Sequence, residues 1–280
     1  GIHMRRLRFL TGRHRSPSTN TTLGLLLAFN AGAVNAGGFL VLHMYTSHMT
    51  GFASQVADGL VLGNLTLLLN ALGALLAFIC GAAVSAMLIN WGQQYQLRSV
   101  YALPLLIESA LMLVFGLMGA ITLTWHTPFA LPLTVLLLSF IMGLQNAVGT
   151  KSSGGKIRTT HMTGNITDLG IELGKMLYWN RRGTPVAALV RHSRERLWLF
   201  TGLVGMFILG GLMGAAGFSY VGFICVVPLA ALLLALSLPP FLEDVQRSAH
   251  LRQLLRAIAE RLHLRRRRTQ PEDGAPPRDD

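Results

Sequence analysis

The chain has 280 residues, of which 51% are hydrophobic and 13% are charged, and its formal net charge is +12 at pH 7. Soluble domains usually carry about a quarter charged residues, so this composition excludes an ordinary water-soluble fold. The two cysteines, Cys80 and Cys225, lie inside apolar runs, which excludes a disulfide-rich secreted scaffold. The composition predicts an all-α integral membrane protein with several membrane-crossing helices.

In chain order, a basic segment over residues 1–21 precedes the first apolar stretch. Two short, more polar helices are predicted over residues 48–63 and 161–178, and both are expected to be broken or re-entrant. Six stretches are long and apolar enough to cross about 30 Å of hydrocarbon: residues 22–42, 65–90, 101–123, 130–149, 197–218 and 219–241.

Basic residues flank membrane spans on the cytoplasmic side, and here they favour six crossings over eight. We therefore expect a multi-pass protein of a bacterial inner membrane with both termini in the cytoplasm. Because the basic residues flank apolar spans, the high charge is attributed to topology and no nucleic-acid partner is expected.

After Pro239-Pro240 the chain becomes polar, and leucines recur at helical spacing among arginines over residues 242–268. This pattern predicts an amphipathic basic helix that lies on anionic membrane lipids. A helix that binds a protein partner is the alternative. The tail over residues 269–280 is predicted to be disordered.

Sequence elements of the first half recur in the second half in the same order. Ser47–Gly51 recurs as Thr160–Gly164, each copy follows an Asn-Ala pair, and Phe78–Gly81 is echoed by Phe207–Gly210. We therefore predict two membrane repeats over residues 22–123 and 124–241. With three crossings each, the second repeat is inverted, as is common in secondary transporters; four crossings each would make the repeats parallel.

Each copy also carries a glycine pair, Gly37-Gly38 or Gly154-Gly155, which is expected to end the preceding helix. Phe39–Thr46 would then run extended, and His48, His161 or the neighbouring threonines would cap the short helices. Helix N-termini that meet near the midplane would offer unpaired N–H groups to a polar or anionic solute.

Ten residues of the two copies are predicted to bind this solute. Thr50, Thr163 and the glycines can instead be explained as helix caps and close packing positions. The predicted site residues are Asn35, His48, Thr50, Gly51, Gln145, Asn146, His161, Thr163, Gly164 and Asn165.

Acidic residues inside apolar or weakly polar helices are costly and usually functional. Asp58, Glu108 and Asp168 are therefore candidates for proton coupling. Glu172 and Lys175, three residues apart, are expected to form an ion pair on the helix surface.

No cofactor, metal site or catalytic residue is predicted. His43 and His48 are five residues apart, His161 has no neighbouring His or Cys, and no nucleophile with a base can be recognised. We therefore expect that the protein is not an enzyme.

Around the duplicated motif the sequence resembles the YoaK-like family of bacterial integral membrane proteins. The resemblance covers roughly residues 22–241 and is carried by Ala33–Gly37 with His48–Gly51, and by Met142–Ala147 with Thr160–Asn165. In that family the first copy more often has an acid where Asn35 stands and an asparagine where Phe52 stands. The resemblance implies a multi-spanning inner-membrane protein and points to transport without indicating a substrate.

The sequence therefore predicts one of two functions. The first is a secondary transporter of a small polar or anionic solute, bound at the midplane between the two copies of the motif. The alternative is a membrane scaffold or sensor that recruits a partner through its basic C-terminal helix. Small-residue runs such as Gly210-Gly211 permit close helix contacts within one chain or in a homo-oligomer.

Overall fold

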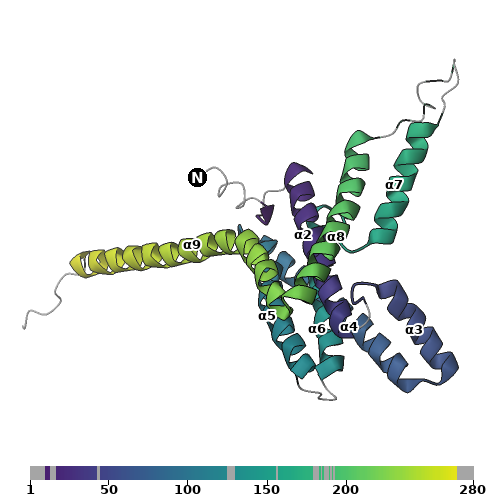
Figure 1. Ribbon diagram of the computed structural model, residues 1–280. Coiled ribbons are helices and arrows are strands. Elements are labelled where there is room, and N and C mark those ends of the chain that lie inside the picture. Colours follow the sequence, from purple (N-terminus) through teal and green to yellow (C-terminus); the bar gives the residue numbers. More distant parts are fainter. Residues whose placement is uncertain are drawn as a thin grey trace, which may run out of the picture.

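The described part of the protein is helical and contains no strand. The computed structural model describes residues 10–12, 17–42, 45–124, 130–155, 157–178, 183, 185, 189, 191 and 193–269. The helices, labelled in Figure 1, are α2 (Pro17–Leu42), α3 (Met49–Leu62), α4 (Leu65–Gln94), α5 (Ala102–Thr124), α6 (Ala130–Ser152), α7 (Met162–Leu177), α8 (Arg194–Tyr220), the short 3-10 helix η2 (Phe223–Cys225) and α9 (Val226–Thr269).

Six of the described helices, namely α2, α4, α5, α6, α8 and the first part of α9, are long and apolar enough to cross a membrane. Helices α3 and α7 have 14 and 16 residues. At 1.5 Å per residue they extend roughly 21–24 Å, less than the hydrocarbon thickness of about 30 Å. The number of spanning helices agrees with the prediction, and the short helices lie within one residue of their predicted bounds.

The strongest packing in the bundle pairs α2 with α8. Both helices carry a glycine where they cross. A Cβ atom on Gly32 would overlap the carbonyl oxygen of Phe207, and a Cβ atom on Gly210 would overlap that of Phe29. Only glycine lets the two backbones approach this closely.

Helices α4 and α6 cross in the same way. A Cβ atom on Gly81 would overlap the carbonyl oxygen of Phe140, and one on Gly143 would overlap that of Phe78. All four crossing sites therefore use a phenylalanine and a glycine three positions apart. Two of these pairs, in α4 and α8, belong to the sequence repeat; the pairs in α2 and α6 were not predicted.

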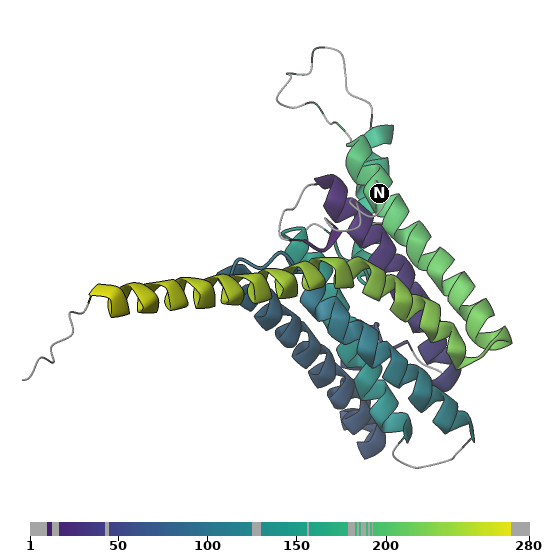
Figure 2. The same cartoon turned by 90° about the vertical axis from the view of Figure 1, so that its left-hand side faces the viewer.

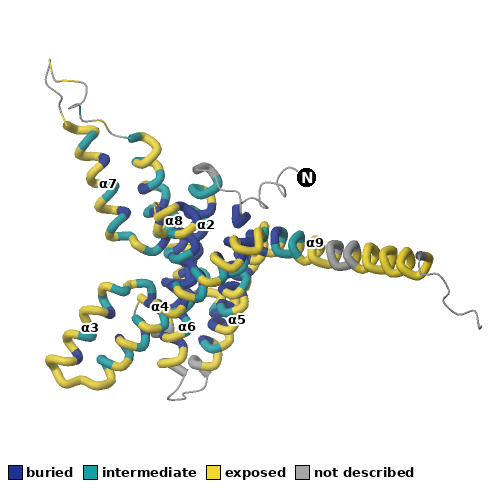
Figure 3. The backbone as a smooth tube through the Cα atoms, turned by 180° about the vertical axis from the view of Figure 1, so that it is seen from behind, coloured by how far each residue is buried: buried dark blue, intermediate teal, exposed yellow. Residues whose placement is uncertain are grey.

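The buried residues concentrate where these helices meet α5 and α9, whereas α3 and α7 stand away from this core (Figure 3). Gly63 adopts a left-handed backbone conformation, φ +65°, which turns the chain tightly from α3 into α4. The side chain of Asn64 then caps α4 by accepting a hydrogen bond from the Leu67 N–H at 3.2 Å.

The prediction that Gly37-Gly38 ends a helix is wrong, because α2 continues to Leu42 and Phe39–Leu42 is helical. Gly37 instead permits close packing, since a Cβ atom there would lie 2.8 Å from the ring of Phe218. The prediction for the second copy is confirmed: Gly154 and Gly155 follow the end of α6 with φ values of +65° and +88°.

Helix α9 also differs from the prediction, which placed a separate helix over residues 242–268. It runs through Pro239-Pro240 to Thr269, and its C-terminal part leaves the bundle (Figure 2). Pro240 has no N–H for the carbonyl oxygen of Leu236. That oxygen instead accepts a hydrogen bond from Thr11 Oγ1 at 2.6 Å, which replaces the backbone hydrogen bond that Pro240 cannot donate.

Candidate functional site

A cavity of about 910 Å³ lies where the N-termini of α3 and α7 approach helices α2, α4, α6 and α8. In Figures 1 and 3, α3 and α7 leave this region in diverging directions, each paired with the helix that follows it. Six predicted site residues line the cavity: Asn35, His48, Thr50, Asn146, His161 and Thr163.

Part of the described cavity wall consists of matched residues from the two sequence copies. His48 and His161 begin the short helices, and Phe78 and Phe207 come from the two glycine crossings. The ring of Tyr45 stacks on that of Phe39 with centroids 4.7 Å apart, and both rings also line the cavity. The cavity therefore combines polar side chains with a largely aromatic and aliphatic wall.

The two matched asparagines differ in their hydrogen bonding. Ser47 Oγ donates to Asn35 Oδ1 at 3.0 Å. Within the described part of the chain, the buried oxygen Oδ1 of Asn146 has no hydrogen-bond partner. Because an unpaired buried acceptor is unfavourable, a turn of the Asn146 side chain that brings this oxygen to the cavity would let it accept a hydrogen bond from a donor there.

The predicted residues Gly51 and Gly164 are absent from the described cavity lining and support it from behind. A Cβ atom on Gly51 would press against the ring of His48, and one on Gly164 would press against the ring of His161. Both histidines occupy the predicted N-cap positions, but neither side chain makes a capping hydrogen bond. The glycines therefore leave room for the imidazole rings beside the cavity.

Gln145 and Asn165, also predicted to bind solute, are buried and lie outside the described lining of the cavity. Gln145 Nε2 donates to the Leu27 carbonyl oxygen at 2.7 Å. Asn165 Nδ2 donates to the Arg158 carbonyl oxygen at 3.0 Å, which fixes the loop before α7. Both amides are used for internal contacts, so their role in the structure is to hold the surrounding segments.

The three predicted proton-coupling acids occupy different environments, and the described cavity lining includes none of them. Asp58 is exposed on α3, and Asp168 is half-buried on α7. Glu108 of α5 is fully buried, 3.4 Å from Nδ2 of Asn30 in α2. Asn30 was not among the predicted site residues, although an amide inside a charge-free apolar helix is a sequence signal for such a position.

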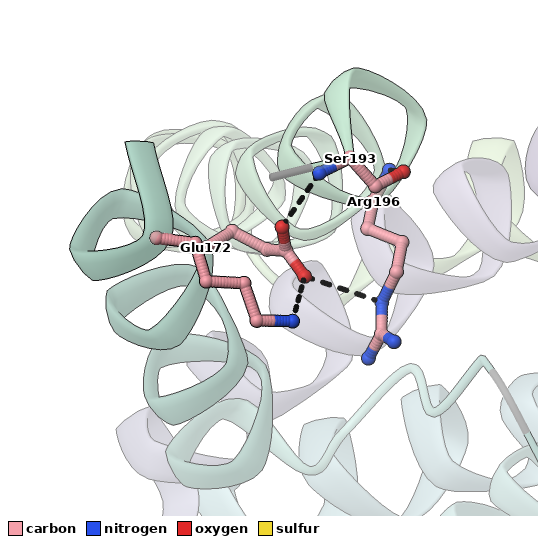
Figure 4. A network of polar contacts seen from close by, with 4 residues as sticks. Glu172, Ser193 and Arg196 are labelled. Carbon is pink, nitrogen blue, oxygen red and sulfur yellow. Dashed lines mark hydrogen bonds and ion pairs between the residues drawn. The ribbon is translucent and has the colours of Figure 1, made fainter. Parts of the chain in front are cut away.

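Glu172 joins α7 to α8, as Figure 4 shows. Its Oε2 accepts from the Ser193 N–H at 2.9 Å, and its Oε1 lies 3.5 Å from Lys175 Nζ and 3.6 Å from Arg196 Nε. The predicted ion pair with Lys175 is thus confirmed as part of a larger network, but Glu172 is buried and does not lie on the helix surface as expected. The Ser193 N–H, followed by the charges of Lys175 and Arg196, lowers the pKa of Glu172 despite its burial.

No three His, Cys, Asp or Glu side chains of the described residues come together as a metal site would require. Four of the six apolar helices, α2, α4, α6 and α8, contribute to the described cavity lining, whose chemistry comes from amides, hydroxyls, imidazoles and aromatic rings. This architecture defines a multi-pass helical membrane protein.

The family model described as "Protein of unknown function (DUF1275)" matches residues 23–238, and the chain belongs to this family. The chain is also 28% identical over 165 residues to "UPF0700 transmembrane protein YoaK" of Bacillus subtilis (strain 168); these residues are 58% of this chain and 70% of that relative. The expected likeness to the YoaK-like family is confirmed. No solved structure matches the chain.

Proposed function

We propose that the protein is a secondary transporter of a small polar or anionic solute that binds in the cavity between α3 and α7. The observation that carries this proposal is the unpartnered Oδ1 of Asn146, a buried acceptor on the wall of a cavity of about 910 Å³. A cavity of this size and composition is typical of small-molecule sites.

The chemistry of the wall favours a solute with both polar and apolar parts. Described residues of the wall include Asn35, Asn146, His48 and His161 beside aromatic rings, and none of them is Lys, Arg, Asp or Glu. The first N–H groups of α3 and α7 have no intrahelical acceptors. The Met162 N–H donates to the Thr160 carbonyl oxygen at 3.1 Å, and the remaining groups add donors for a carboxylate or another anionic group.

The proposal includes an inverted relation between the halves α2–α5 and α6–α9. It is supported by the matched glycine crossings of α2 with α8 and of α4 with α6, and by three membrane-spanning helices in each half. Helix α2 of the first half packs on α8 of the second half, and α6 of the second half packs on α4 of the first half. These contacts between the halves create two units, α2–α7–α8 and α3–α4–α6, on either side of the cavity.

Alternating access would arise from rocking of these two units against each other. The tight glycine crossings favour motion of each unit as a rigid body, because close backbone contacts resist sliding. Residues such as Phe78 and Phe207, one from each unit, would then approach or separate across the solute.

The proposal places the protein in a bacterial inner membrane with both termini in the cytoplasm. The basic residues of segment 1–21 and of the C-terminal helix support this orientation. The exposed part of α9, which carries Ile258 and Leu262 beside Arg261 and Arg265, suits a position on anionic lipid. Recruitment of a protein partner by the same helix is the competing function.

The experiment that tests the transporter proposal is thermal unfolding of the detergent-purified protein in the presence of organic anions, nucleobases, amino acids and sugars. A solute that binds the folded state raises the unfolding midpoint. We expect at least one class to do so, and we expect Asn146→Ala and Thr163→Ala to reduce that shift.

The matched control is Asp58→Asn, a change at an exposed acid outside the described cavity lining, which should keep the wild-type shift. Equal shifts in the control and in both cavity variants would remove the site assignment. A panel without any effective solute, together with capture of a protein by the C-terminal helix, would favour the scaffold function.

A further inference from the structure

A buried polar cluster lies beside the cavity and consists of Asn30 of α2, Glu108 of α5 and Gln145 of α6. Each of the three residues is 0% exposed. Asn30 Nδ2 donates to Gln145 Oε1 at 2.9 Å and to Glu108 Oε1 at 3.4 Å. Gln145 Nε2 in turn reaches Thr159 Oγ1 at 3.5 Å, in the segment that leads into α7.

Two oxygen atoms of this cluster lack a hydrogen-bond donor within the described part of the chain. Among the described residues, Oε2 of Glu108 and Oδ1 of Asn30 have no hydrogen-bond partner. A proton on Oε2 of Glu108 would turn one of these two unpaired acceptors into a donor. The neutral carboxylic acid therefore fits the surrounding side chains better than a carboxylate does.

The helices packed against Glu108 offer it no countercharge. Helix α2 contains no charged residue or histidine, α5 contains no charged residue other than Glu108, and the only charged residue of α6 is Lys151, which is exposed in its last turn. Helix α4 contributes Cys80 as its one titratable group, and η2 contributes Cys225.

The other charged or titratable residues near the cluster are either remote from Glu108 or exposed. The first charged residue of α9 is Glu243, which follows the two prolines and pairs with Arg98 at 3.6 Å. Arg158 and His161, which flank Thr159, are both exposed. Burial of an ionised carboxylate without a countercharge is strongly unfavourable, so geometry alone favours the protonated form.

The fold does not require this polarity. The matched pairs Phe29/Phe140, Gly32/Gly143 and Asn35/Asn146 align α2 with α6. In the same alignment, the counterpart of Asn30 is Ile141, and the counterpart of Gln145 is Val34, both of which are buried. At both of these buried positions the polar residue is thus absent from the matching helix, so the helix crossing itself does not depend on it.

Two covalent neighbours connect the cluster to the cavity wall. Gln145 precedes Asn146, and Thr159 precedes Thr160; Asn146 and Thr160 both line the cavity. A change in the hydrogen bonds of Gln145 would therefore move two parts of the cavity wall together, one on α6 and one in the segment that precedes α7.

We propose that Glu108 is the proton-carrying group of this protein and that its protonation controls the cavity through Asn30, Gln145 and Thr159. On release, the proton passes from Oε2 to water, and the resulting carboxylate draws the Asn30 amide away from Gln145. The Gln145–Thr159 contact then rearranges. The link to transport rests on the proposed function, whereas the protonation and its effect on the cavity do not.

The first test is infrared difference spectroscopy of the full chain in lipid nanodiscs, recorded between acidic and alkaline pH. We expect a carboxylic-acid C=O band at neutral pH that is lost in Glu108→Gln and retained in the control Asp58→Asn. Absence of the band in the wild type at neutral pH, or its persistence in Glu108→Gln, would overturn the proposal. Glutamine resembles the neutral acid in shape, so this variant should fold.

The second test measures the effect on the cavity without any solute. In a background of Cys80→Ala and Cys225→Ala, Thr163→Cys is labelled with a maleimide over a range of pH. The same Thr163→Cys protein carrying Glu108→Gln as well serves as the reference, because its labelling rate varies with pH only through ionisation of the thiol. We expect an additional pH dependence when Glu108 is present, and its loss in Glu108→Gln and in Asn30→Ile.

Identical labelling profiles with and without Glu108 would overturn the proposed coupling. Asn30→Ile introduces the residue found at the matching position of α6, so loss of folding is not expected to obscure the result. Neither test uses a solute, and failure of the transporter proposal in the solute panel would therefore be seen separately.

Discussion

Ser47 donates its hydroxyl proton to the side-chain oxygen of Asn35 over 3.0 Å, which ties the segment before α3 to α2. The second copy of the motif has Thr160 in place of Ser47 and Asn146 in place of Asn35. There the asparagine oxygen has no partner among the described residues. These matched positions are thus alike in residue type and different in the hydrogen bonds that they leave available.

Replacing Ser47 by alanine should destabilise the fold by about 1 kcal/mol, because Asn35 Oδ1 loses its donor. The change can be measured as a shift in the midpoint of thermal unfolding in detergent. Thr160→Val is the matched control, since its hydroxyl makes no hydrogen bond to Asn146 Oδ1. Equal losses of stability in the two variants would show that the Ser47–Asn35 bond contributes nothing specific.

Gly210→Ala should destabilise the protein by about 1–3 kcal/mol, because the added methyl group would overlap the Phe29 carbonyl oxygen at the α2–α8 crossing. Gly205 lies in the same helix, and a Cβ atom there would meet nothing within 4 Å. Gly205→Ala should therefore be neutral or stabilising by up to about 1 kcal/mol, from helix propensity. Unfolding in mixed detergent micelles compares the two variants directly, and a destabilisation of the same size in both would refute the importance of the crossing.

The helices could be predicted from the sequence because charged residues are nearly absent from the membrane-spanning segments and are concentrated in the segments between them. The duplicated motif also located six residues that line one cavity. These features depend on composition and repetition, which are visible along a single chain.

The orientation of individual amides could not be predicted in this way. Gln145 and Asn146 are adjacent, yet one lies in the buried cluster and the other on the cavity wall. Successive helical positions differ by about 100° in direction, and only the placement of neighbouring helices decides which face meets the cavity. The continuation of α9 through Pro240 likewise depends on Thr11, more than two hundred residues away in sequence.

The Glu172 network should make the α7–α8 connection sensitive to acid. The Ser193 N–H lowers the pKa of Glu172 below its usual value, with help from Lys175 and Arg196. A carboxyl whose folded-state pKa is lowered contributes stability above its unfolded-state pKa of about 4.3, and this contribution is lost as pH falls through the folded value. Glu172→Gln should therefore be less stable than the wild type at neutral pH, with a difference that shrinks below about pH 4.

Thermal unfolding across pH tests this prediction, with Glu195→Gln as the control. Glu195 is an exposed acid in the first turn of the same α8 helix. A difference between wild type and Glu172→Gln that stays constant down to strongly acidic pH would contradict the proposed role of the charge.

The C-terminal part of α9 should bind anionic lipid through the arginines 265–268 and insert the side of the helix that carries Ile258 and Leu262. Each basic residue near an anionic surface contributes about 1 kcal/mol, and the attraction weakens with salt.

In the background without Cys80 and Cys225, Leu262→Cys labelled with an environment-sensitive dye should shift its emission to the blue in phosphatidylglycerol nanodiscs. The shift should be smaller in phosphatidylcholine, at high salt, and after replacement of the four arginines by glutamine. Glu260→Cys, on the other side of the helix, should report water in every lipid. Equal emission from both positions in phosphatidylglycerol would mean that the helix does not lie on the membrane, and the arginines would then be available to a protein partner.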